Sequence, residues 1–172
     1  QAPDGAQVWD VLVDAFDESV RHVHDHVRHA AYRVYPLPLV SPDEGPSALV
    51  VDPADPVFSP YGWHDTNGQP GAEYTTTWGN NVTLFEDRDG NDGAGLSPNG
   101  GTGLVFDFPP NPADSCDFRA AAVNAFYMVN RMHDIHSRFG FDETAGYFQR
   151  NHYAGSSSGA GDPVVVDVQD SS

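Results

Sequence analysis

The chain has 172 residues, of which 25 are acidic and eight basic, so its formal net charge is −17. A surface this acidic repels nucleic-acid phosphates and anionic lipids, which excludes nucleic-acid and membrane-surface binding as main functions. No apolar run approaches the ~20 residues that a bilayer-spanning helix needs. The single cysteine excludes an intramolecular disulfide framework. Because the chain begins at Gln1 without a signal-peptide stretch, we expect a processed or excised product.

The N-terminal segment predicts a strand followed by a helix. Residues 8–13 alternate loosely and favour a short strand. Five apolar residues then recur at helical spacing and predict an amphipathic helix over residues 14–31. They are Phe16, Val20, Val23, Val27 and Ala30. A short extended run at residues 32–35 is stopped by Pro36.

The middle of the chain, residues 41–112, is rich in Gly and Pro and predicts short strands joined by turns. β-branched and aromatic residues favour strands at 75–78 and 82–86. Two further short strands are expected at 48–51 and 104–108. The glycine-rich stretch between Asp87 and Gly103 is expected to form a surface loop.

One long helix, over about residues 115–139, is the clearest predicted element. Ser115 or Asp117 can cap its start, and Gly140 suits a left-handed residue at its end. Its apolar face is predicted to carry Ala122, Phe126, Val129, His133 and His136. A final strand at 164–168 is apolar enough to need neighbours on both sides. The pattern predicts an α+β fold, with a twisted, mainly antiparallel sheet packed on one long helix and an additional N-terminal strand and helix.

A histidine cluster lies in the predicted N-terminal helix. On a helix His22, His26 and His29 share one face, where neutral imidazoles could bind zinc or nickel. That face lies opposite the valine stripe, so a solvated, pH-sensitive surface is the preferred interpretation.

A candidate calcium loop contains Asp87, Asp89 and Asn91, with oxygen ligands at alternate positions. The loop departs from an EF-hand because Asp92 stands where glycine is needed and Pro98 where the bidentate glutamate is needed. An acidic turn is therefore favoured over a bound ion, and calcium stays a candidate.

A second histidine pair, His133 and His136, lies late in the long helix around Asp134. A hydrogen-bonded, partly buried pair is favoured over a metal-ligand pair. Asn81-Val-Thr83 is a glycosylation sequon. Cys116 lies between two acidic residues and makes a poor nucleophile. The sequence contains no His-Glu-x-x-His, Gly-x-Ser-x-Gly, phosphate-binding loop or dinucleotide fingerprint.

Several segments together resemble fungalysin-type secreted zinc metalloendopeptidases, in the same order along the chain. The resemblance covers about residues 30–172. Its residues are Tyr32-Arg-Val-Tyr-Pro36, Ser59-Pro-Tyr-Gly-Trp-His-Asp65, Thr76-Thr-Trp-Gly-Asn-Asn-Val82, Met132-His-Asp-Ile135, Gly140-Phe-Asp-Glu143, Gly146-Tyr-Phe-Gln149 and Gly161-Asp-Pro-Val-Val-Val166.

The resemblance implies that residues 32–172 form the N-terminal lobe of a thermolysin-like catalytic domain, incomplete and forming one wall of the cleft. Residues 1–31 would then be the tail of a propeptide and its junction. In the family, a later His-Glu-x-x-His helix binds zinc, and a zinc-bound water attacks the peptide carbonyl. No catalytic residue and no zinc ligand can be placed on this sequence, so the chain alone is expected to be inactive.

The implied partners are a protein or peptide substrate, the C-terminal catalytic lobe and the propeptide, outside the cell. At such a junction the clustered histidines could promote release of the propeptide when protonated. Two alternatives to the peptidase stay open. One is a non-enzymatic, acidic, secreted β-rich binding module that could bind calcium, and the weaker one is a histidine-cluster metal-binding protein.

Overall fold

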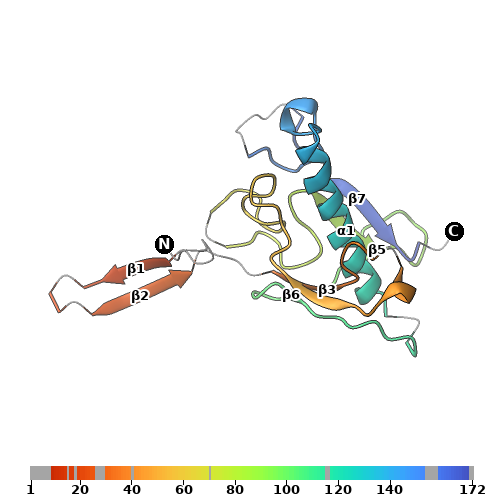
Figure 1. Cartoon of the computed structure of the whole chain (residues 1–172), viewed down its shortest axis with the longest axis horizontal. Coiled ribbons are helices and arrows are strands. Elements are labelled where there is room, and N and C mark those ends of the chain that lie inside the picture. The colour runs from red at the N-terminus through yellow and green to blue at the C-terminus, as the bar shows by residue number, and fades with distance from the viewer. Residues whose placement is uncertain are drawn as a thin grey trace.

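The computed structural model describes residues 9–14, 16–17, 19–25, 30–39, 41–69, 71–114, 117–153 and 159–170. These residues form a two-stranded hairpin followed by a body with one long helix, two small sheets and many loops (Figure 1). The predicted α+β class is confirmed. No helix in this described part has the length and apolarity that a membrane span needs.

The N-terminal hairpin corrects one prediction. β1 (Trp9–Val13), which matches the predicted strand, pairs antiparallel with β2 (Val20–Asp25). The helix expected over residues 14–31 is therefore wrong. Asp14 accepts a hydrogen bond from the Phe16 amide and Asp17 one from the Ser19 amide, and such local bonds compete with a helix.

The same correction removes the predicted histidine face. His22 and His24 lie in β2, opposite Leu12 and Asp10 in the register. A strand does not bring residues i, i+4 and i+7 together as a helix does. His26 and His29 lie outside the described residues.

The body contains two small sheets, of which the first is mixed and the second is parallel. In the first, β3 (Ala31–Val34) pairs antiparallel with β4 (Ala48–Val51) and parallel with β6 (Val105–Phe106). In the second, β5 (Val82–Glu86) pairs parallel with β7 (Val164–Val168). The expectation of a mainly antiparallel sheet is wrong, because long crossover connections separate β3 from β6 and β5 from β7, and such connections allow parallel pairing.

Two predicted strands are shorter than expected. Residues 75–78 make only isolated bridges, Thr76 with Asn99 and Trp78 with Thr83. The strand predicted at 104–108 is reduced to the two residues of β6. The strand at the C-terminal end has alternating exposure, and β5 is its one neighbour in the described sheets. A half-buried strand, not a doubly buried one, therefore stands at that edge.

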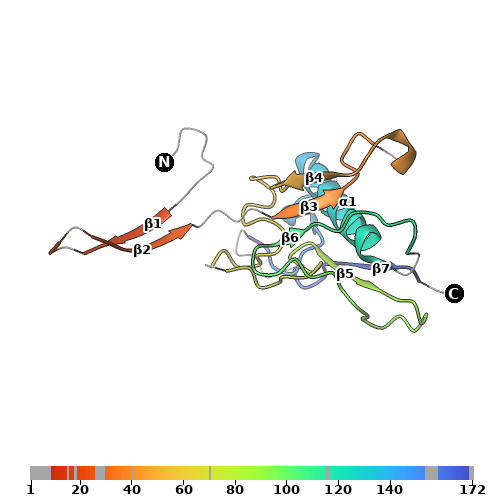
Figure 2. The ribbon, with the colours of Figure 1, turned by 90° about the horizontal axis from the view of Figure 1, so that it is seen from below.

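The helix α1 (Arg119–Arg138) packs against β3, β5 and β7 (Figure 2). It begins four residues later than predicted. Asp117 accepts hydrogen bonds from the Arg119 amide and guanidinium just before its first turn, and Ser115 lies outside the described residues. Gly140 has a φ of 96° just after the helix, as its position predicted.

The core lies between α1 and strands of both sheets, and it is strongly aromatic. Tyr32, Trp63, Phe106 and Phe126 are all fully buried there. The Tyr32 ring stacks on Phe106 with centroids 5.4 Å apart, and it lies 5.2 Å from Trp63. These contacts fix the loop around Trp63 against α1, and this loop carries much of the polar site described next.

Candidate functional site

A buried carboxylate in the last third of α1 organises the most polar part of the interior. Asp134 is 2% exposed. It accepts hydrogen bonds from the Asp55 amide at 3.0 Å, from Ser59 Oγ at 2.7 Å and from Trp63 Nε1 at 3.3 Å. His133 Nδ1 lies 3.0 Å from it. Because a buried carboxylate is stable only when its oxygens are satisfied, this set of donors ties the loop at 55–63 to the helix.

His133 is held in one orientation by this carboxylate. Burial lowers the pKa of His133, which outweighs the opposing effect of Asp134, so the ring is neutral and its Nδ1–H donates to Asp134. Its Nε2 then accepts from Gln149 Nε2 at 3.3 Å, and its ring lies edge to face with Tyr147, with centroids 4.0 Å apart. The prediction of a buried, hydrogen-bonded histidine is confirmed for His133. His136 is exposed instead.

Buried amide side chains extend the network towards β5. The Asn81 side-chain amide is 1% exposed and donates to Ser59 Oγ at 3.3 Å and to Asn130 Oδ1 at 3.1 Å. Asn130 in turn donates to the Phe126 carbonyl. In the folded chain the nitrogen of the glycosylation sequon is therefore a buried structural donor and is not accessible to a glycan.

An ion pair between Arg138 and Asp55 lies at the surface end of the network. The Arg138 guanidinium donates to the buried carboxylate of Asp55. Burial opposes ionisation of Asp55, but the Val57 amide and Arg138 hold the pKa of this carboxyl below its usual range. Arg138 therefore acts as the counter-ion of the loop at 55–61.

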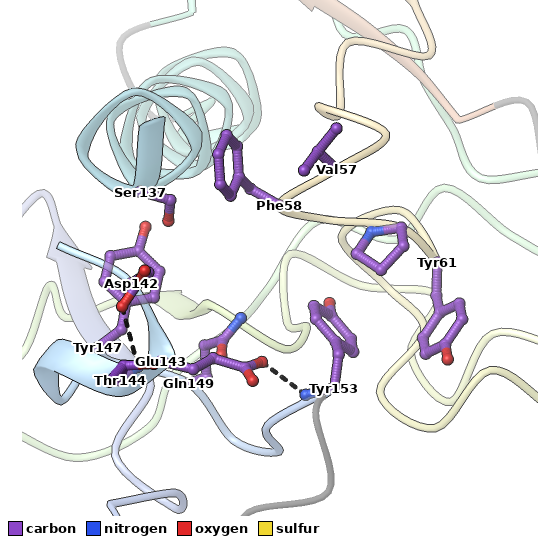
Figure 3. A pocket seen from close by; sticks show the side chains of 11 residues that line it. Val57, Phe58, Tyr61, Ser137, Asp142, Glu143, Thr144, Tyr147, Gln149 and Tyr153 are labelled. Atoms are coloured by element: carbon purple, nitrogen blue, oxygen red, sulfur yellow. Dashed lines mark hydrogen bonds between the residues drawn. The ribbon is translucent and has the colours of Figure 1, made fainter. Parts of the chain in front are cut away.

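A cavity of about 470 Å³ lies between this loop and the end of α1 (Figure 3). The 3-10 helix η2 (Glu143–Ala145), whose first turn is capped by Asp142, forms one of its sides. Some of its lining residues are aromatic or apolar, and the others are acidic or polar. They are Val57, Phe58, Pro60, Tyr61, Ser137, Asp142, Glu143, Thr144, Tyr147, Gln149 and Tyr153.

A second hollow, of about 310 Å³, is apolar and lies where α1 borders β5 and β7. Val129, Met132, Phe141, Phe148 and Val164 line it together with the two histidines of α1. Met132 is 54% exposed, and Phe148 is nearly as exposed. An open apolar hollow rimmed by exposed large side chains is typical of an interaction surface.

The predicted calcium loop is held by its own side chains. The two carboxylate oxygens of Asp87 accept the backbone amides of Asn91 and Asp92, at 3.2 and 3.0 Å. Asp89 accepts from the Asn91 side-chain amide at 2.7 Å. Asp87, Asp89 and Asn91 are thus close in space, as their spacing predicted, but they bond to one another and to the loop backbone. Calcium binding here stays a prediction.

The described residues offer no site for zinc. Nowhere in the described part of the chain do three His, Cys, Asp or Glu side chains gather so that they could hold a metal ion. Cys116 lies outside the described residues. No chemical step through zinc can therefore be derived from the residues that the structure describes.

Comparisons with known proteins show which family the sequence belongs to. The sequence profile of the fungalysin metallopeptidase family matches residues 31–172. The chain belongs to the fungalysin metallopeptidase family. The resemblance noted in the sequence is thereby confirmed.

Curated relatives at about 35% identity carry metalloproteinase names. The chain is 36% identical over 166 residues to extracellular metalloproteinase 1 of Arthroderma gypseum, and 35% identical over 165 residues to extracellular metalloproteinase 5 of Trichophyton tonsurans. It is 34% identical over 168 residues to extracellular metalloproteinase 2 of Phaeosphaeria nodorum. Each match covers 93% of this chain but only 26% of the relative, so the chain spans about a quarter of the length of these relatives.

Sequence reasoning singled out Asp134 and His133 of the polar network and missed most of their partners. Asp134 was singled out beside its histidines, whereas Asp55, Ser59 and Asn130 carried no signal of their own. The paired turn residues Asp52-Pro53 and Asp55-Pro56 mark a tight loop but do not show which side chain turns inward. Gln149 lay in a segment that was noted only for its family resemblance.

Proposed function

We propose that this chain is the N-terminal lobe of the catalytic domain of a secreted zinc metalloendopeptidase precursor that hydrolyses internal peptide bonds of proteins. Residues 32–172 are the lobe, and residues 1–31 are the propeptide tail and junction. The observation that carries the proposal is the family match over residues 31–172, together with similarity to extracellular metalloproteinases over 93% of the chain. The similarity to the relatives thus extends upstream of residue 31, into the hairpin.

The lobe's role in this proposal is to shape one wall of the substrate cleft. It supplies no zinc ligand from its described residues, so zinc and the groups that activate water would come from the C-terminal lobe. What this chain's residues contribute is rigidity. Asp134 receives donors from three positions of the loop at 55–63 and fixes that loop against α1. The lobe is inactive by itself.

The apolar hollow between α1 and β7 is the proposed contact with the C-terminal lobe. Met132, Phe141 and Phe148 would leave a large apolar area in water, at a cost of about 25 cal/mol for each Å². Covering this hollow with the C-terminal lobe would stabilise both lobes and bring the second wall of the cleft against α1.

The first test is the reading frame downstream of Ser172. We expect it to continue into a His-Glu-x-x-His helix, and a stop codon at that point would reject the proposal. The product of the whole frame is expected to cleave casein in a chelator-sensitive way, and the 172-residue chain to leave casein intact.

The second test addresses the lobe contact. In the complete protein, Met132→Asp is expected to lower the yield of active enzyme by exposing a charge to the hollow. Val105→Asp, at a similarly exposed residue of β6, is the matched control and should leave the yield unchanged. For the junction, N-terminal sequencing of the active enzyme should place the mature start near residues 29–32.

A further inference from the structure

The cavity beside η2 combines an aromatic wall with an acidic one. Tyr61 and Tyr153 meet edge to face, with ring centroids 5.0 Å apart, and Phe58 lies above them. Asp142 and Glu143 lie across from Tyr61 (Figure 3). At about 470 Å³ the cavity has room for a long side chain.

Gln149 gives this cavity a buried acceptor. The side chain is 1% exposed and lines the cavity. Its Nε2 donates to His133 Nε2 at 3.3 Å and to Asn81 Oδ1 at 3.5 Å, whereas its Oε1 has no hydrogen-bond partner among the described residues. A buried acceptor of this kind is normally satisfied, so a donor entering the cavity would gain a bond that the chain itself does not supply.

The electrostatic field in the cavity is negative. Asp142 and Glu143 line it, and none of its described lining residues is Lys, Arg or His. Burial raises the pKa of the Tyr153 hydroxyl, and the charges of Asp134, Asp65 and Glu143 raise it further. The net charge of −17 adds a long-range attraction for cations.

These features exclude most classes of ligand. An anion would be repelled by Asp142 and Glu143. A metal ion would lack the third side-chain ligand that a site needs among the described residues. A purely apolar group would leave Gln149 Oε1 without a donor. An organic cation fits both walls, because its charge meets the carboxylates while its face stacks on the aromatic rings.

We propose that this cavity binds the guanidinium group of an arginine side chain presented by a peptide. A guanidinium has five N–H donors in a planar fork, enough to reach Gln149 Oε1 and a carboxylate at once, and its flat face packs on tyrosine. A lysine ammonium has neither the fork nor the flat face. The site is independent of the peptidase proposal, because binding can be measured on this chain without any cleavage.

Binding of three short peptides to the isotopically labelled chain, followed by NMR, tests the proposal. The peptides are acetyl-Gly-Arg-Gly-amide, its lysine counterpart and its citrulline counterpart, which has the same shape as arginine without the charge. The arginine peptide should bind about tenfold more tightly than either other peptide, and it should shift the resonances of Tyr61, Tyr153 and Gln149. Equal affinity for the citrulline or lysine peptide would overturn the assignment, as would shifts confined to another part of the chain.

A charge-neutralising variant gives the second test. Glu143→Gln keeps the acceptor for the Tyr153 amide, which Glu143 Oε1 holds at 2.6 Å, but removes the negative charge. This variant should lower the affinity for the arginine peptide by about tenfold while leaving the circular dichroism spectrum unchanged. Glu44→Gln is the control. It changes the net charge by the same amount at an exposed residue of the 3-10 helix η1 (Pro42–Glu44), which does not line the cavity, and it should not affect binding. Equal arginine affinity in the Glu143→Gln variant and the parent would refute the proposal.

Discussion

His64 makes the stability of the fold depend on pH. Its ring is fully buried and stacks on Phe106 and Phe126, with centroids 5.0 and 5.1 Å away. Nδ1 lies 3.0 Å from the Trp78 carbonyl oxygen and therefore donates to it. Nε2 has no partner among the described residues. A proton added at Nε2 would bring a charge into a buried, largely aromatic environment, which is unfavourable.

The size of the effect follows from the pKa. Burial lowers the pKa of His64 from 6.5 to about 4. Between pH 6.5 and pH 4 the unfolded chain binds a proton at His64 and the folded chain does not. The contribution of neutral His64 to the free energy of unfolding is therefore complete above pH 6.5 and is lost as the pH falls towards 4. At about 1.4 kcal/mol for each pH unit, the loss in the free energy of unfolding is about 3 kcal/mol.

Urea denaturation followed by tryptophan fluorescence at pH 7.5, 6, 5 and 4.5 measures this loss. His64→Phe keeps the ring stack and removes the titration, so it should be less stable at pH 7.5, where the bond to Trp78 is missing, and lose less stability on acidification. His136→Gln, which removes an exposed histidine, is the control and should follow the parent. Because the parent and His64→Phe share both His133 and His136, the titration of His133 cancels between these two proteins. Parallel pH profiles for the parent and His64→Phe would refute the reasoning.

Three further predictions follow from the packing. Asp134→Ala should lower the free energy of unfolding by at least about 3 kcal/mol, because several buried donors lose their acceptor; a loss below 1 kcal/mol in urea would contradict this. Gly79→Ala places a Cβ 2.0 Å from the Trp63 carbonyl oxygen and should cost at least about 1–3 kcal/mol, whereas Gly103→Ala meets only a contact at 3.7 Å and should be neutral by thermal melting. Calcium bound at Asp87 should raise the melting temperature, and an unchanged temperature up to millimolar calcium would remove the loop as a site.

Local sequence patterns predicted the strands whose formation depends mainly on the residues of the strand itself. Residues 48–51 and 82–86 coincide with β4 and β5, because β-branched residues between turn signals favour strands wherever they pair. Local patterns did not predict whether these strands pair parallel or antiparallel. Whether β5 pairs parallel with β7 depends on how α1 crosses the sheet, and this is decided by packing across more than 75 residues of chain.

The hairpin shows where periodicity misleads. Val20 and Val23 are three residues apart, which fits a helix, but the same segment alternates His22, Val23 and His24 as a strand does. The deciding signal was the turn. Asp14 and Asp17 both accept hydrogen bonds from amides two residues ahead, and such local bonds offer the backbone a turn in place of a continuous helix.

The last two turns of α1 explain why the polar site escaped the sequence. A surface helix normally buries its apolar stripe, but here His133, Asp134 and Ser137 are buried while Met132, Ile135 and Phe139 are exposed. The inward polar face is stable because the loop at 55–63 supplies donors that periodicity cannot reveal. The outward apolar side chains have no such compensation, and one of them, Met132, lines the apolar hollow. The C-terminal end of α1 therefore needs two partners. Its buried polar side chains need a polar loop within the lobe, and its exposed apolar side chains need an apolar partner outside it. The proposed C-terminal lobe would be that apolar partner.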